Sequence, residues 1–183
     1  MRKTRAVRRT LVVGVGLGLG LGLAAAARAA ETPQAAGVDP KQAFELLKGL
    51  AGTWNGNIET ATGPAATVQF VLASGGTVVE EVQFPGTPHE MRSLYHMDGP
   101  DLVMTHYCAM GNQPHMRLDK GRSSTKELIF DFAGGTNMDP AKDMHIHSGW
   151  IRLVGPDRVE AEWMAYAGTQ PQGGKRFFLT RAR

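Results

Sequence analysis

Imidazole, thioether and thiol side chains are concentrated in one stretch of the chain. All six His and seven of the nine Met lie between residues 89 and 147, together with the one Cys, Cys108. Imidazole nitrogens bind metal ions, Cys or Met beside His suits Cu(I), and an imidazole next to a thiol generates a nucleophilic thiolate. The stretch therefore offers three kinds of chemistry: ligand binding through polar rings, metal binding, and catalysis by a Cys–His pair.

Period-two alternation predicts how these groups are placed. Segment 101–109 puts His106 and Cys108 on one face of a strand. Segment 144–153 puts two imidazoles on a face with apolar residues, where a buried polar ring needs a partner or a ligand. That face reads His145, His147, Gly149, Ile151 and Leu153. We therefore expect the His145 and His147 rings to point into a core.

The acidic residues of other strands are expected to face solvent. In segment 158–167, Trp163 shares an apolar face, and Glu160 and Glu162 occupy the opposite one. Glu80 and Glu81 are likewise interpreted as a solvated strand face. The interior is thus expected to be apolar apart from the His residues.

The elements that must position these groups are nearly all strands. Asp39-Pro40-Lys41-Gln42 is typical of a helix start, because Asp caps free N–H groups and Pro suits the first helical position. From Thr53 onward the period is two, with turn residues about every ten positions. Strands are expected at about 53–60, 66–73, 77–84, 89–97, 101–109, 114–119, 126–132, 144–153, 158–167 and 175–181.

The connections predict an antiparallel meander. Ser74-Gly75-Gly76, Asp98-Gly99-Pro100-Asp101, Gly155-Pro156-Asp157 and Gly173-Gly174 are typical hairpin turns. A meander of about ten strands closes without exposed edges, and such a barrel encloses one small-ligand cavity. The predicted fold is therefore all-β, an antiparallel meander β-barrel with a short N-terminal helix; an open β-sandwich is the alternative.

The N-terminus has the pattern of a signal peptide. Five basic residues lie in positions 1 to 9, the uncharged run 11–27 follows, and Ala27-Arg28-Ala29 offers a cleavage site after Ala29. Arg8-Arg9 resembles part of a twin-arginine signal, and a retained membrane anchor is the alternative to cleavage. We expect a signal peptide at 1–29, a flexible leader at 30–38 and one domain at 39–183, located in the periplasm or secreted with no stable membrane anchor.

Charge argues against a nucleic-acid partner. Residues 1–29 hold six of the 20 Lys and Arg and none of the 17 Asp and Glu, so the other 14 basic and 17 acidic residues leave a net charge of −3. The basic excess lies in a segment that export would remove.

One short motif connects these observations to a known superfamily. Leu50-Ala51-Gly52-Thr53-Trp54-Asn55-Gly56, directly after the helix, resembles the opening Gly-x-Trp signature of the calycins, which include lipocalins, fatty-acid-binding proteins and nitrobindin-like barrels. In calycins this Trp packs across the barrel floor beneath an Arg near the end of the last strand, and Trp54 and Arg181 occupy the matching places. Further stretches resemble secreted bacterial lipocalin-like proteins of unknown function: Gly75-Gly76-Thr77-Val78-Val79-Glu80-Glu81, Thr105-His106-Tyr107-Cys108, Gly111-Asn112-Gln113-Pro114 and Trp163.

The resemblance implies a ligand cavity and names no ligand. Our main interpretation is a small-molecule site in the barrel cavity or at its mouth, with a few polar groups fixing the orientation of the ligand. The candidate ligand-binding residues are Arg92, His96, His106, Cys108, Asn137, His145, His147 and Trp163. No cofactor or metal is identified from the sequence.

Other functions stay open. Nitrobindin-like relatives bind haem through a His, which makes His106, His145 or His147 the candidate ligand, and the His/Met/Cys cluster would suit copper. A Cys108–His106 pair could form the centre of an enzyme, but no third orienting group is identifiable, so an enzyme is less expected than a binder. The His residues could also be satisfied structural groups in a protein that acts through its surface.

Two loop features have a structural and a functional interpretation. Gly111-Asn112-Gln113-Pro114 suits ligand contacts at a rim, but turn chemistry alone accounts for most of it. Asp131, Asp139 and Asp143 surround Asn137 and could bind a hard cation, although the spacing of a Ca²⁺ loop is missing.

Overall fold

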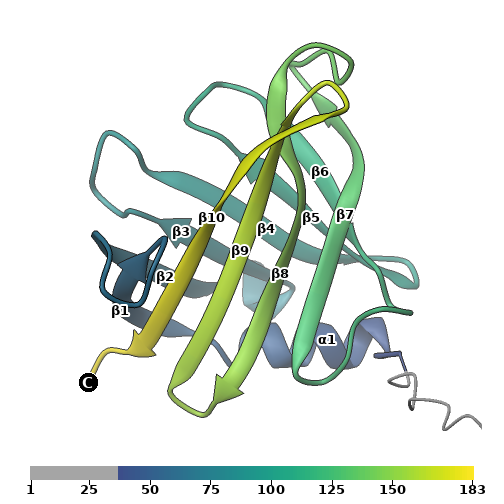
Figure 1. The fold of residues 1–183 in the computed structure, drawn as a ribbon. Coiled ribbons are helices and arrows are strands. Elements are labelled where there is room, and N and C mark those ends of the chain that lie inside the picture. Colours follow the sequence, from purple (N-terminus) through teal and green to yellow (C-terminus); the bar gives the residue numbers. More distant parts are fainter. Residues whose placement is uncertain (1–36) are drawn as a thin grey trace, which may run out of the picture. The chain divides into compact units, whose positions relative to one another are not determined.

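A computed structural model describes residues 37–183 (Figure 1). The predicted signal peptide at 1–29, and the leader up to residue 36, lie outside the described residues. The described part is one helix, α1 (Pro40–Lys48), followed by ten strands and a short 3-10 turn, Ser74–Gly76. Within this part no helix has the length and apolar character needed to cross a bilayer.

Helix α1 begins and packs as its sequence predicts. The Asp39 carboxylate accepts hydrogen bonds from the backbone N–H groups of Lys41 and Gln42, and Pro40 occupies the first turn. Phe44 and Leu47 bury the apolar face of the helix in the core. Val38, which the sequence assigned to the flexible leader, is also buried, and its N–H donates to the Lys120 carbonyl.

The strands form one closed antiparallel barrel, which confirms the predicted fold class. Each strand pairs with the next, and β1 pairs with β10, so the open-sandwich alternative is wrong. The bounds are β1 Gly52–Ile58, β2 Ala65–Ala73, β3 Val78–Gln83, β4 Met91–Asp98, β5 Asp101–Tyr107, β6 Gln113–Leu118, β7 Glu127–Thr136, β8 Met144–Gly155, β9 Arg158–Ala167 and β10 Gln170–Arg181.

The barrel has a helix-covered end and a mouth. Figure 1 shows α1 lying at the end where β1 begins and β10 finishes. At this end the Trp54 indole N–H donates to the Leu50 carbonyl at 2.7 Å, and the Arg181 guanidinium lies over the Trp54 ring. The loops β5–β6, β7–β8 and β9–β10 lie at the opposite end, which we call the mouth.

Two strands are longer than the sequence predicts, because their glycines lie in strands instead of turns. Gly173-Gly174 was expected to be a hairpin turn, but the register of β10 against β9 shifts between Pro171 and Gly173, so a β-bulge absorbs the glycines inside β10. The turn itself lies at Gly168, which has a φ of 58°. Similarly, β7 continues through Gly134 and Gly135.

Candidate functional site

A row of three polar side chains crosses the inner wall of the barrel. In the antiparallel register, Glu81 of β3 lies opposite Ser93 of β4, and Ser93 lies opposite His106 of β5. Directly opposed residues share a face and lie close together. All three are buried, with at most 4% of each residue exposed.

Two further residues complete this cluster through hydrogen bonds to Glu81. The Tyr95 hydroxyl donates to Oε2 of Glu81 at 2.5 Å, and the Gln83 amide Nε2 donates to Oε1 at 2.8 Å. Ser93 Oγ and His106 Nδ1 are hydrogen-bonded at 3.0 Å. We call Glu81, Gln83, Ser93, Tyr95 and His106 the polar cluster.

Burial controls the ionisation of the cluster. Loss of hydration raises the pKa of the Glu81 carboxyl, whereas the donors on Tyr95, Gln83 and Trp163 act to lower it. Burial, followed by the nearby Glu81 charge, raises the pKa of the Tyr95 hydroxyl. Burial lowers the pKa of the His106 imidazole to about 4, so this ring is neutral at neutral pH.

One ring nitrogen of the cluster, Nε2 of His106, is buried and lacks a hydrogen-bond partner among the described residues. Nε1 of Trp163 makes no hydrogen bond of ordinary geometry with these residues, but this N–H acts as a donor toward the Glu81 carboxyl. The Trp163 ring is fixed against Gly149 of the neighbouring strand, where an added Cβ would lie 2.1 Å from a ring carbon. Buried polar groups are nearly always paired in native proteins, so His106 Nε2 is a position at which a polar group of a ligand could pair.

An apolar cavity lies at the mouth, next to the polar cluster. It has a volume of about 460 Å³. Met91, which lines it, pairs directly with Gln83 of the cluster, and Phe84, which also lines it, contacts the buried Phe177 ring at 5.8 Å. Its other lining residues are Ile58, Thr87, His89, Ala109 and Lys175. This volume lies within the range of small-molecule sites.

Of the residues predicted from the sequence, His106 and Trp163 lie in this interior. Two others lie on the outer face of β4. The Arg92 guanidinium is 48% exposed and pairs with Glu80 and Glu90 at 2.6 and 2.7 Å. His96 follows the inward Tyr95 in the strand, and its Nδ1 is hydrogen-bonded to the Met97 carbonyl. Arg92 was expected to orient a ligand in the cavity, but strand alternation directs its side chain outward.

His145 and His147 do not share one inward face with Ile151. The register of β8 against β9 shifts between Ile146 and Ser148, so a bulge at His147 interrupts the alternation. The two rings instead bond to each other, Nε2 of His145 to Nδ1 of His147 at 3.0 Å, and His145 Nδ1 bonds the Asp143 carbonyl at 2.9 Å. His145 is fully buried, and the His147 ring stacks on Tyr166 at 4.3 Å.

Asn137 and Cys108 belong to loops at the mouth. The Asn137 amide donates to the Gly111 carbonyl at 2.6 Å and so ties the β7–β8 loop to the β5–β6 turn. Cys108 lies just past the end of β5, within the turn that Gly111 closes with a φ of 90°. Gly111 thus lies in a turn, as the turn interpretation predicts, whereas Gln113 and Pro114 already belong to β6. The imidazole expected to activate Cys108 bonds Ser93 through Nδ1.

Three buried aromatic rings pack against one another in the interior. The centroids of Tyr95 and Phe130 are 5.5 Å apart, and those of Phe130 and Trp163 are 6.3 Å apart. Between residues 37 and 183 no three His, Cys, Asp or Glu side chains are grouped as metal ligands. Asp131 instead bonds Arg122, and Asp139 pairs with Lys142.

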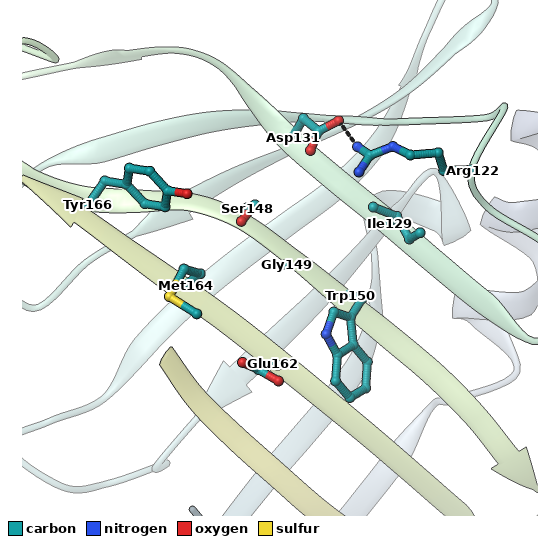
Figure 2. A pocket seen from close by; sticks show the side chains of 9 residues that line it. All are labelled: Arg122, Ile129, Asp131, Ser148, Gly149, Trp150, Glu162, Met164 and Tyr166. Carbon is teal, nitrogen blue, oxygen red and sulfur yellow. Dashed lines mark hydrogen bonds and ion pairs between the residues drawn. The ribbon is translucent and has the colours of Figure 1, made fainter. Parts of the chain in front are cut away.

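A second hollow, of about 330 Å³, lies on the outer face of β7, β8 and β9 (Figure 2). Figure 2 shows the rings of Tyr166 and Trp150 at its two ends, with Ser148 and Gly149 between them. The Arg122–Asp131 pair borders it. The face of Trp150 is already covered by the Arg152 guanidinium, 4.5 Å from the ring centroid.

Sequence reasoning missed most of the polar cluster. Glu80 and Glu81 were both assigned to solvent, yet only Glu80 faces outward, and Glu81 is 3% exposed. Because adjacent strand residues must face opposite sides, one of two consecutive Glu in a closed barrel has to point inward. The alternation Glu81, Gln83 and Ser93, Tyr95 on two neighbouring strands was the signal that could have revealed the site. A comparison of the chain with models of known protein families and with curated proteins gives no match.

Proposed function

We propose that this protein is an exported small-molecule-binding barrel that holds its ligand in the interior or at the mouth. One observation carries the proposal: an apolar cavity of about 460 Å³ lies at the mouth, next to a buried polar cluster in which His106 Nε2 has no partner among the described residues. Ligand sites combine an apolar lining with a few polar groups that fix orientation, and this arrangement has both.

The end opposite the mouth supports a calycin-type barrel. Trp54 and Arg181 are paired in the register of β1 and β10, and the guanidinium covers the indole ring. The calycin resemblance rests on this pair, the preceding helix and the meander of strands. A scaffold closed at one end leaves the mouth as the entry for a ligand.

Export is the second part of the proposal and rests on the sequence of residues 1–29. We expect the mature chain to begin at Ala30, in the periplasm or outside the cell. The intact mass of the protein recovered from the exported fraction tests this. An unprocessed N-terminus in that fraction would contradict cleavage and support a retained anchor.

Native mass spectrometry with an absorption spectrum tests ligand binding most broadly. The protein is purified from the exported fraction without chelators, so that a bound molecule is retained. We expect an organic adduct at one per chain. A haem absorption band or a stoichiometric copper mass would instead support the metal alternative, with His106, His145 and His147 as residues to replace.

The enzyme alternative depends on Cys108. A binding protein should tolerate Cys108→Ser with unchanged ligand affinity, because this residue lies in a turn outside the polar cluster. Loss of an activity in this variant, with binding intact, would favour a Cys-dependent enzyme.

A further inference from the structure

We propose that the interior site selects uncharged amphiphiles with a hydroxyl or carboxamide head and rejects carboxylates. This inference rests on the proposed function, because it names the ligand class of the same site.

The described part of the buried interior contains the Glu81 carboxyl group but no Lys or Arg that could balance the charge of a second carboxylate. Among residues 37–183 the buried polar side chains include Glu81 and His106, and none of them is a Lys or an Arg. Lys175, which lines the mouth cavity, is 57% exposed and already paired with Glu59 at 2.8 Å. An ionised head entering beside Glu81 would lose its hydration without gaining a counter-charge.

Two hydrogen bonds order the cluster. Ser93 Oγ is bonded to His106 Nδ1 at 3.0 Å, and the Tyr95 hydroxyl donates to Oε2 of Glu81 at 2.5 Å. The Ser93 hydroxyl can donate to Nδ1 or accept from it.

The bond to Ser93 leaves His106 Nε2 able to take either role. When Ser93 donates to Nδ1, the proton of the neutral ring sits on Nε2, which is then a donor; when Nδ1 donates to Ser93, Nε2 is an acceptor. In both tautomers a carboxylate head would find no buried Lys or Arg among the described residues to balance its charge.

A hydroxyl or carboxamide head suits the unpaired His106 Nε2 in either tautomer of the ring. Hydroxyl and carboxamide groups supply a donor and an acceptor together. The tail of such a molecule would lie against Phe84, Met91 and Ile58 in the mouth cavity.

Three eight-carbon probes that differ only in the head group test the selectivity. Octan-1-ol, octanamide and octanoate are titrated into the protein from the exported fraction at pH 8, where octanoate is ionised, with calorimetry or Trp fluorescence as the signal. We expect octanoate to bind at least about tenfold more weakly than the two uncharged probes. Equal or tighter binding of octanoate would overturn the selectivity while supporting the binding function. Absence of binding for all three would overturn the proposed function itself and the inference with it.

A matched pair of variants assigns the selectivity to the interior. His106→Phe removes both ring nitrogens at similar volume, and His96→Phe makes the same change on the outer face of β4. We expect His106→Phe to weaken the binding of octan-1-ol and octanamide about tenfold and to change the affinity for octanoate little. His96→Phe should leave the affinity for all three probes unchanged. Unchanged binding of the uncharged probes to a folded His106→Phe variant would contradict the role of this ring. If His106→Phe does not fold, the titrations of the wild-type protein with the three probes still test the selectivity.

Discussion

The guanidinium of Arg181, the last residue of β10, lies over the indole ring of Trp54 in β1, with 4.3 Å between the guanidinium carbon and the ring centroid. The same guanidinium donates to the carbonyls of Ala51 and Gly49 at 2.8 and 2.9 Å. One side chain thus connects the last strand to the first and to the end of α1. Closure of the barrel depends on this contact as well as on the backbone ladder.

Arg181→Ala should destabilise the protein by about 2 to 3 kcal/mol, because it removes a cation–π contact and two charge-assisted hydrogen bonds. Arg181→Lys should recover only part of this, since an ammonium cannot present the planar donor pair. Chemical denaturation measures the free energy of unfolding. Arg183→Ala, at the exposed C-terminus, is the control and should change it by less than about 0.5 kcal/mol. Equal effects of the two Ala variants would refute the closing role of Arg181.

Gly149→Ala should cost about 2 to 3 kcal/mol, because the new Cβ would lie 2.1 Å from the Trp163 ring in a packed interior. Gly155→Ala in the same strand is the matched control, since nothing lies within 4 Å of its Cβ position. A Trp163→Leu background should reduce the penalty of Gly149→Ala by about 1 kcal/mol or more. Strict additivity of the two changes would contradict the contact.

The pH dependence of stability should show a contribution from His106. Burial lowers the pKa of this imidazole from 6.5 to about 4 in the folded state. Between these values the unfolded chain binds the proton and the folded protein does not, so stability is lost as the pH falls from 6.5 toward 4. Relative to His106→Gln, the wild-type protein should lose about 2 to 3 kcal/mol between pH 7.5 and 4.5. Parallel stability curves for the two proteins would contradict a neutral buried His106.

Tyr95→Phe should lower the free energy of unfolding by about 2 kcal/mol, because it leaves an oxygen of the buried Glu81 without its donor. Burial raises the pKa of Glu81, so the stability linked to this carboxyl is greatest below the unfolded value of 4.5 and is lost as the pH rises through the folded value. The Tyr95 donor favours the charged form, and its removal should hurt more at pH 8 than at pH 5. Tyr107→Phe, at an exposed position, serves as the control. If Tyr95→Phe lowered the free energy of unfolding equally at pH 5 and pH 8, Glu81 would be neutral at both pH values.

The fold was predictable because local signals agree along the whole chain. Asp39-Pro40 gave the helix start, and period-two segments separated by Gly, Asp and Pro turns gave all ten strands in order. The errors occurred at glycines, because glycine is found both in turns and in β-bulges. Gly173-Gly174 reads as a turn in the sequence, but the pairing of β10 with β9 turns it into a bulge, which depends on contacts between strands.

The site was less predictable, since alternation alone does not say which face is inside. His106 and Trp163 were found because they alternate with clearly apolar residues. Glu81 was missed because an acidic residue normally faces water, and only its bonds to Tyr95 and Gln83 make burial tolerable. The placement of His147 was missed because the β8 bulge leaves no mark in the residue types.

Binding of the neutral amphiphile N-phenyl-1-naphthylamine is the first test of a ligand site at the mouth of the barrel. Its fluorescence rises in an apolar site, and two variants of β4 separate the mouth from the outer face. Met91→Trp fills the cavity, whereas Leu94→Trp adds the same bulk to the opposite face of the strand. We expect saturable binding to the wild-type protein, affinity weaker by at least about tenfold in Met91→Trp, and little change in Leu94→Trp. Absence of binding to the wild-type protein, or equal binding to Met91→Trp, would contradict a ligand site in this barrel.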